Sequence, residues 1–169
     1  MGVFVSIARA LARAVHASRV LTCFTPLTKV RAVVVMVDAD EPGAQELVYS
    51  ANKFFTSRTI RTAIFAVSAR KNCPDLMGAT MLTGRAVNWF GKPRRGRRRP
   101  PVAVGEELFV NMVERECFTS EYCALASKAV FKVGRASSSK GIYNMFVSSD
   151  GHNPVEVFTQ MSNLLDTVK

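Results

Sequence analysis

The sequence predicts an α/β fold in which helices cover a four-stranded mixed sheet. Three observations predict it: a strand, helix, strand succession over residues 29–67, two apolar runs near the C-terminus, and a closing amphipathic helix. The chain has 169 residues, of which 48% are hydrophobic, and this is enough for one well-buried core. We therefore expect a single domain at residues 26–169, preceded by an N-terminal segment at residues 1–25.

The first half of the chain carries the clearest pattern. Residues 29–38 form a continuous β-branched run, which suits a strand buried on both faces. The acids and the proline at residues 40–42 are typical of a helix start. Residues 60–67 form a second apolar run, and the short links predict a right-handed βαβ unit with parallel strands. The intervening helix has one apolar stripe, made of Leu47, Val48, Ala51, Phe54 and Phe55.

The C-terminal part predicts a hairpin and a helix. Residues 129–133 and 142–147 are apolar and flank a glycine-bounded loop at residues 134–141, as in a β-hairpin. Asn153 and Pro154 then have the chemistry of an N-cap and a first helical position. The predicted buried stripe of the last helix is Val157, Met161, Leu164, Leu165 and Val168.

Residues 70–127 do not belong to this pattern, and we interpret them as a partly helical, basic insertion that decorates the core. One predicted helix in this block places apolar residues on a shared face. Those residues are Leu108, Phe109, Met112, Val113 and Cys117.

The N-terminal segment is basic and free of acids. Arg9, Arg13 and Arg19 recur at helical spacing, opposite small and apolar residues, and the first acid is Asp38. This pattern is typical of a mitochondrial presequence, either cleaved or retained, and predicts a location in the mitochondrial matrix. The alternative is an ordinary basic surface helix. No apolar run reaches the roughly 18 to 20 residues that a membrane span needs.

The remaining positive charge is concentrated in the run GKPRRGRRRPP at residues 91–101. The formal net charge is +10, yet outside this run and residues 1–37 the chain holds twelve bases against thirteen acids. Two local basic segments favour docking on a polyanion, and they favour nucleic acid over a membrane surface. Trp89 is a candidate for base stacking or for closing an apolar cluster, and the run alternatively fits a nuclear localisation signal or a solvated loop. The predicted RNA-binding residues of the run are Lys92, Arg94, Arg95, Arg97, Arg98 and Arg99.

Two blocks of the sequence resemble the mitochondrial large-subunit ribosomal protein fifty-three family. Residues 26–37 match its PxxxVR strand, residues 44–57 its amphipathic helix, and residues 58–70 its second strand, while residues 129–168 resemble its C-terminal half. The resemblance covers about half the chain and supplies no template for residues 70–127. It implies a thioredoxin-like β-α-β-β-β-α sandwich. It also implies a structural constituent of the mitochondrial large ribosomal subunit that contacts rRNA and neighbouring ribosomal proteins.

The chemistry of an enzyme is missing from the motifs. A thioredoxin-like oxidoreductase needs a cysteine at the start of its first helix, where this chain has Asp38, Asp40 and Glu41. We interpret these acids as helix caps and His152 as part of a turn. We therefore expect no catalysis, cofactor, metal or small-molecule substrate. Two alternatives remain open: a mitochondrial RNA-processing or RNA-chaperone factor, and an accessory subunit of a respiratory complex.

Overall fold

The computed structural model describes residues 2–16, 23–70, 73, 75–94, 105–135, 141–148 and 153–168. Within these ranges the chain forms one six-stranded sheet in which every strand pair is parallel. The strand order is β3-β2-β1-β4-β5-β6. The strands are β1 Ala32–Asp38, β2 Arg61–Val67, β3 Thr80–Met81, β4 Leu108–Asn111, β5 Phe131–Gly134 and β6 Met145–Phe146.

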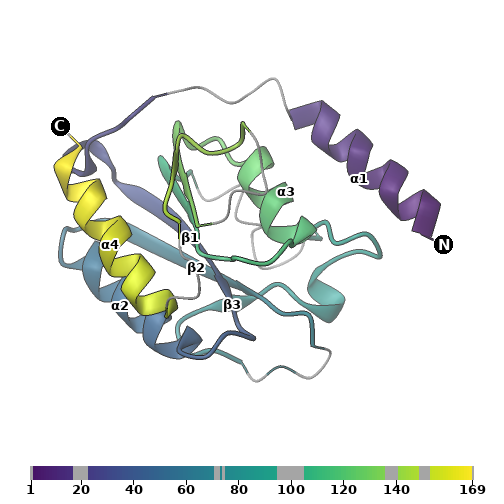
Figure 1. The fold of residues 1–169 in the computed structure, drawn as a ribbon, viewed down its shortest axis with the longest axis horizontal. Coiled ribbons are helices and arrows are strands. Elements are labelled where there is room, and N and C mark those ends of the chain that lie inside the picture. The colour runs from purple at the N-terminus through teal and green to yellow at the C-terminus, as the bar shows by residue number, and fades with distance from the viewer. Residues whose placement is uncertain are drawn as a thin grey trace.

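Helices cover both faces of this sheet (Figure 1). The helices α2 (Ala44–Thr56) and α4 (Pro154–Thr167) lie side by side on one face. The helix α3 (Phe118–Ala126) lies on the other, and α1 (Gly2–His16) packs outside α3. The chain is thus a three-layer α/β sandwich with one further helix at its edge.

The strand β1 is central because its side chains pack into the cores on both faces of the sheet. All seven of its residues are buried. Val35 packs in the core beneath α2 and α4, whereas Val34 and Met36 pack in the core beneath α3. This alternation is what a β-branched run buried on both faces predicts, and β1, α2 and the parallel partner β2 are confirmed. The predicted stripe of α2 is confirmed too, with Phe54 partly buried and the other four residues buried.

The predicted four-stranded mixed sheet is wrong, and so is the thioredoxin-like fold that the family resemblance implied. Residues 70–127 are not a decoration: they contribute β3, β4 and α3. Strand β4 pairs with β1 on one side and β5 on the other, at the middle of the sheet. The helix predicted here is wrong as well: Leu108 and Phe109 lie in the buried strand β4, Met112 and Val113 follow it, and Cys117 is the N-cap of α3. A short continuous apolar run fits both a buried strand and a helix stripe.

The predicted C-terminal hairpin is also wrong. Strands β5 and β6 are parallel, whereas the two strands of a hairpin are antiparallel. The Tyr143 ring lies on Gly134 so closely that a Cβ there would meet it at 2.8 Å. Asn144 then aligns the strands, because its side chain accepts a hydrogen bond from Lys132 N at 2.7 Å and its N–H donates to Lys132 O at 2.8 Å.

The last helix begins where the sequence predicts. Asn153 is the N-cap, its side chain accepting from Val155 N at 3.0 Å, and Pro154 is the first helical residue. The stripe needs two corrections: Leu164 is 43% exposed with Phe158 buried in its place, and Val168 is the partly buried C-cap of the helix. The helix is rotated toward Phe54 and Phe55, whose rings make edge contacts with Phe158. None of the helices in the described ranges is long and apolar enough to cross a membrane.

Candidate functional site

The strand order reverses direction between β1 and β4, and open parallel sheets bind ligands outside the carboxyl ends of their strands at such a point. Here that edge carries charged side chains from three neighbouring strand ends. Asp38 ends β1 and is followed by Asp40 and Glu41, Glu114 and Arg115 follow β4, and Arg135 follows β5.

These charges are joined in ion pairs. Arg115 pairs with Asp38, which is 2% exposed, and its Nη2 lies 3.7 Å from an Asp40 oxygen. The buried Arg135 bridges two acids: its Nη1 lies 2.8 Å from Glu41 Oε1 and its Nη2 lies 2.8 Å from Glu114 Oε2. Arg70 adds a longer contact, with its Nε 3.6 Å from Asp40 Oδ1. The edge is therefore a cluster of paired charges, and we call it the crevice network.

The protonation of the network follows from burial and pairing. Desolvation acts to raise the pKa of Asp40, but hydrogen bonds from Ser68 and Ala69 and the charge of Arg115 hold it below its usual value. Desolvation raises the pKa of Glu41, and Arg135 offsets part of this effect. For Arg115, desolvation lowers the pKa, but bonding to Asp38 outweighs it and the pKa is raised. The network thus favours the charged forms of Asp40 and Arg115, whereas burial favours the neutral form of Glu41.

The sequence suggested that these acids cap α2, but the structure shows that they do not. The N-cap is Gly43, whose φ of 83° lies in the left-handed region, and it makes no side-chain cap bond. Asp40 instead ties the loop after β2, accepting from Ser68 Oγ at 2.7 Å and from Ala69 N at 2.6 Å. Carboxylates at the position where a dinucleotide's pyrophosphate would approach repel it, so dinucleotide binding is disfavoured here. His152, which the sequence predicts in a turn, lies outside the described residues.

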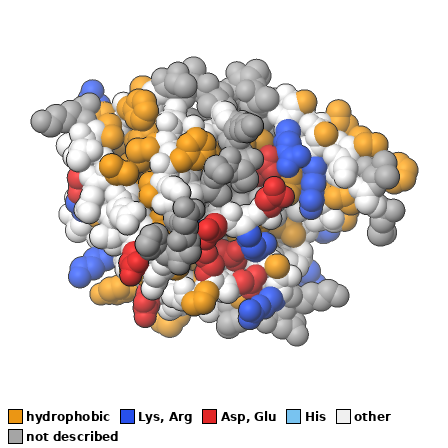
Figure 2. Space-filling view, viewed as in Figure 1, with side chains coloured by type: hydrophobic (Ala, Val, Ile, Leu, Met, Phe, Trp, Pro, Cys, Tyr) orange, Lys and Arg blue, Asp and Glu red, His pale blue; other side chains and the backbone are white. Residues whose placement is uncertain are grey.

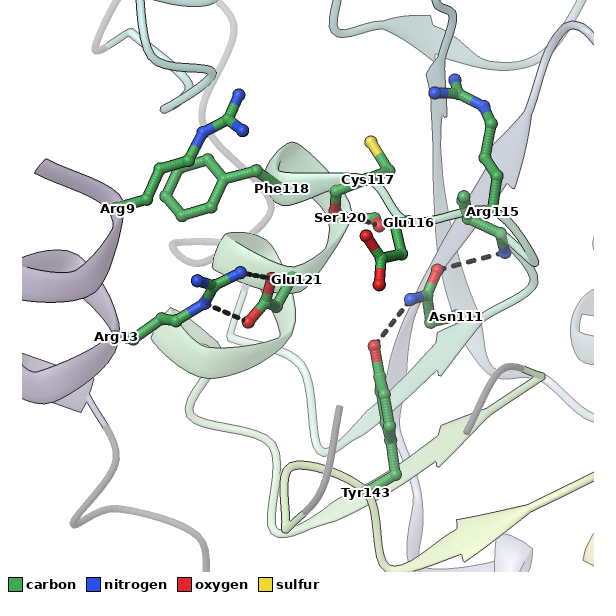
Figure 3. Close-up of a pocket in the computed structure, with 11 residues that line it drawn as sticks. Arg9, Arg13, Asn111, Arg115, Glu116, Cys117, Phe118, Ser120, Glu121 and Tyr143 are labelled. Carbon is green, nitrogen blue, oxygen red and sulfur yellow. Dashed lines mark hydrogen bonds and ion pairs between the residues drawn. The ribbon is translucent and has the colours of Figure 1, made fainter. Parts of the chain in front are cut away.

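Beside the network is a polar cavity of about 150 Å³ between α1, α3 and the end of β4 (Figure 3). Its floor is Asn111, whose Nδ2 donates to Tyr143 Oη at 2.6 Å and whose Oδ1 accepts from Val113 N at 3.2 Å. Cys117 and Ser120 line the side formed by α3. The polar groups of the floor bond to one another, so the cavity is a pre-formed but small recess.

The wall opposite is made by two arginines of α1. Arg13 makes a two-armed ion pair with Glu121: its Nε donates to Oε1 at 2.6 Å and its Nη2 donates to Oε2 at 2.7 Å (Figure 3). Arg9 donates to Phe90 O at 3.2 Å. Both guanidinium groups face the ring of Phe118, at 5.0 Å and 5.8 Å from its centroid. These contacts attach α1 to the domain by its basic face.

Residues 86–94 form a second element of the site, an ordered loop. Val87 and Pro93 form an antiparallel bridge, and Asn88 N donates to Lys92 O at 2.8 Å. Gly91, at a φ of 97°, makes the turn, and the side chain of Asn88 accepts from Lys92 N at 2.8 Å. We call this the tryptophan loop, because Trp89 stands near its tip with 66% of its surface exposed.

The structure brings five of the ten predicted RNA-binding residues to one side of the molecule. Arg9 connects α1 to the tryptophan loop through its bond to Phe90 O. Lys92 is exposed, its Nζ 5.4 Å from the ring centroid of Tyr122, and the exposed Arg94 donates to Val87 O at 3.1 Å. The predicted residues Arg19, Arg95, Arg97, Arg98 and Arg99 lie outside the described residues. The five placed residues are Arg9, Arg13, Trp89, Lys92 and Arg94.

Sequence reasoning missed the crevice network. Its signal was present, because Glu114 and Arg115 follow one buried apolar run, at residues 108–113, and Arg135 follows another. Charged residues at the carboxyl ends of neighbouring parallel strands meet at one edge of a sheet. A helix at residues 108–113 would hide this signal, because only a strand there brings Glu114 and Arg115 to that edge.

Comparison with known protein families matches residues 6–168 to a family of unknown function, DUF6913. No curated protein and no solved structure matches the chain. The match spans α1 from Ser6 onward, all six strands and α4, so α1 lies within the family's matched region along with the sheet.

Proposed function

We propose that this chain, which belongs to the DUF6913 family, binds RNA through its tryptophan loop and arginine run and acts as a structural constituent of a ribonucleoprotein particle. The observation that carries the proposal is Trp89. Its exposed ring is displayed on an ordered loop that leads directly into the arginine run, and this loop also carries the exposed side chains of Lys92 and Arg94.

An aromatic ring next to arginines suits single-stranded RNA. An unpaired base stacks on such a ring with a contribution of about 1–3 kcal/mol, while guanidinium groups bind the flanking phosphates. Phe90 supports the loop from behind, with its ring 6.2 Å from that of Phe118, so the exposed face of Trp89 needs little ordering when a base arrives. Lys92 and Arg94 extend the surface toward the run.

The crevice network supports a structural rather than a catalytic role. Catalytic acids and bases need access to the substrate and to a route for protons, whereas Asp38 and Arg135 are buried and engaged in ion pairs. In the described part of the chain no group of three or more His, Cys, Asp or Glu side chains has the arrangement of a metal site. Cys123 is buried in α3, and desolvation raises the pKa of its thiol, which makes it a poor nucleophile.

The particle we propose is the mitochondrial large ribosomal subunit, in the mitochondrial matrix. This step is supported by the acid-free N-terminal helix and by the sequence resemblance over residues 26–70 and 129–168. It has no support from the fold, since the thioredoxin-like part of the resemblance is wrong. The respiratory-complex alternative depended on that fold and is not retained.

The RNA proposal is tested by fluorescence anisotropy with a labelled single-stranded RNA. Changing Arg95, Arg97, Arg98 and Arg99 to Ala is expected to lower affinity at least tenfold near 0.1 M salt. The salt slope should fall by about 0.7 for each phosphate that the variant no longer neutralises. Trp89→Ala should lower affinity by roughly fivefold or more, since the variant has no ring on which a base can stack.

The matched control removes four charges elsewhere, at Lys29, Lys53, Arg61 and Lys128, all of which are exposed. A comparable loss of affinity in this control would mean that net charge alone attracts RNA, and the proposal would fail. The particle is tested separately by sucrose gradients. A ribosomal constituent stays stoichiometric with large-subunit rRNA after a moderate salt wash, whereas an RNA-processing factor is released.

A further inference from the structure

The N-terminal helix is docked the opposite way round from most surface helices. Its arginines face the domain and its apolar residues face outward, which Figure 2 shows as hydrophobic side chains along the outer edge of α1. The exposed fractions are 73% for Phe4, 52% for Ile7, 63% for Leu11 and 65% for Val15. Their spacing of three and four residues forms a continuous stripe, which we call the α1 stripe.

The orientation of α1 is set by specific contacts. A two-armed ion pair and two cation–π contacts hold the arginine face against Glu121 and Phe118. Rotating the helix to bury the α1 stripe would break all of them. Phe4 to Val15 span about 16 Å along the helix, so the stripe is a contiguous apolar surface, and such surfaces mark interaction sites.

We propose that the α1 stripe docks on an anionic lipid surface, with α1 lying flat in the interface. An interfacial helix buries its apolar face among the acyl chains and keeps basic residues on its other side. α1 meets this description because it contains no acid and its polar face is bonded to the domain. The helix has 15 residues, which suits lying on a bilayer and is too short to cross one.

Charge complementarity selects anionic lipid. Arg9 ties the tryptophan loop to α1, so the exposed basic side chains of Lys92 and Arg94 lie on the loop that is attached to this helix. Basic residues near a membrane surface add attraction to acidic headgroups, and an exposed tryptophan favours the headgroup level. Trp89 is such a residue, because its ring is exposed on the loop that Arg9 ties to α1.

A second copy of the chain fits the α1 stripe less well than a lipid surface does. The four exposed residues offer roughly 450 Å² per copy, below the roughly 800 Å² per partner of a stable interface. Pairing two α1 helices would also bring together two chains that each carry a formal net charge of +10. Repulsion between like charges would oppose that dimer.

The test is co-sedimentation of the full chain with vesicles of phosphatidylcholine alone and of phosphatidylcholine mixed with phosphatidylglycerol. We expect binding to the acidic vesicles, and at least a tenfold loss in the double variant Ile7→Ser, Leu11→Ser. The control Met77→Ser, Leu164→Ser also removes two exposed apolar side chains, away from α1, and should bind as the unmodified chain does. Since all four side chains are exposed, the fold should tolerate both variants.

Each remaining outcome overturns the proposal. No binding of the unmodified chain excludes a lipid surface. Equal binding by the Ile7, Leu11 variant would assign vesicle attraction to charge alone, and a change from dimer to monomer in that variant by light scattering would make a second copy the occupant. RNA affinity of the same variant is measured in parallel. It should be unchanged, because the α1 stripe is separate from the surface proposed for RNA.

Discussion

At the scale of single residues, Lys132 shows how a buried charge can serve the fold. It is 2% exposed, yet its ammonium donates to Ala124 O at 2.6 Å and to Ser127 O at 3.0 Å. These are carbonyls at the end of α3, where the helix dipole favours a cation. Burial lowers the pKa of Lys132 to about 8, although the negative charge of the buried Glu106 acts to raise it.

This pKa predicts an unusual pH dependence of stability. An unfolded lysine keeps its proton up to about pH 10.4, while folded Lys132 releases it near pH 8, so between these values the unfolded chain binds more protons. The free energy of unfolding should therefore rise with pH across that window, by up to about 3 kcal/mol. Urea unfolding from pH 7.5 to 10.5 measures it.

The control for this experiment is Lys132→Met, which keeps the other titrating groups. Subtracting its pH profile removes the contributions of tyrosines and cysteines. If the two profiles run parallel, Lys132 titrates normally in the folded protein and its pKa is not lowered.

At the scale of elements, α1 is a helix whose stability depends on its attachment. An isolated helix of 15 residues is marginal in water, so α1 depends on the cluster formed by Phe118, Glu121 and Phe90 O. The residues that attach it are the arginines that were predicted to bind RNA. Because half of the Arg13 side chain is exposed, these contacts hold α1 in place and contribute little to the global fold.

Changing Arg9 and Arg13 to Ala should release α1 without unfolding the domain. Hydrogen exchange of the α1 amides is expected to accelerate at least tenfold, while the Tm of the domain shifts by no more than about 2–4 °C. Arg58→Ala is the control, since it breaks the surface pair with Asp166 at 2.7 Å and leaves α1 untouched. Unchanged exchange in α1 would show that other contacts hold the helix.

At the scale of the whole molecule, the sheet joins segments that the sequence separates. Strand β4, from the block interpreted as an insertion, is the neighbour on which β1 and β5 both depend. Its Leu108, Phe109 and Val110 are fully buried. Removing it would leave β1 and β5 with open edges and the cores on both faces incomplete.

Replacing residues 75–127 with a short Gly-Ser linker should therefore abolish cooperative thermal unfolding, as followed by circular dichroism. If the block were a surface insertion, the shortened chain would still melt cooperatively. Deleting residues 96–103 alone spares every described strand and serves as the control. A cooperative melt in the longer deletion would contradict the central position of β4.

The sequence alone determined the features that depend on local chemistry. The β-branched run of β1, the 3.6-residue period of α2 and the Asn153 N-cap each need no distant partner to be recognised, and the arginine run is evident from composition. Tertiary structure decided the rest. Whether residues 108–111 become strand or helix depends on the vacant edge of β1. The direction of β6 depends on how Tyr143 packs on Gly134.

The same division holds for the candidate site. Helical spacing placed Arg9 and Arg13 on one face of a helix, but periodicity cannot say whether a basic face contacts solvent, RNA or the protein itself. Phe118 and Glu121, more than a hundred residues away in the chain, decided it by offering an aromatic ring and a carboxylate to that face. The α1 stripe is exposed as a direct consequence, because a helix held by its basic side must turn its apolar side outward.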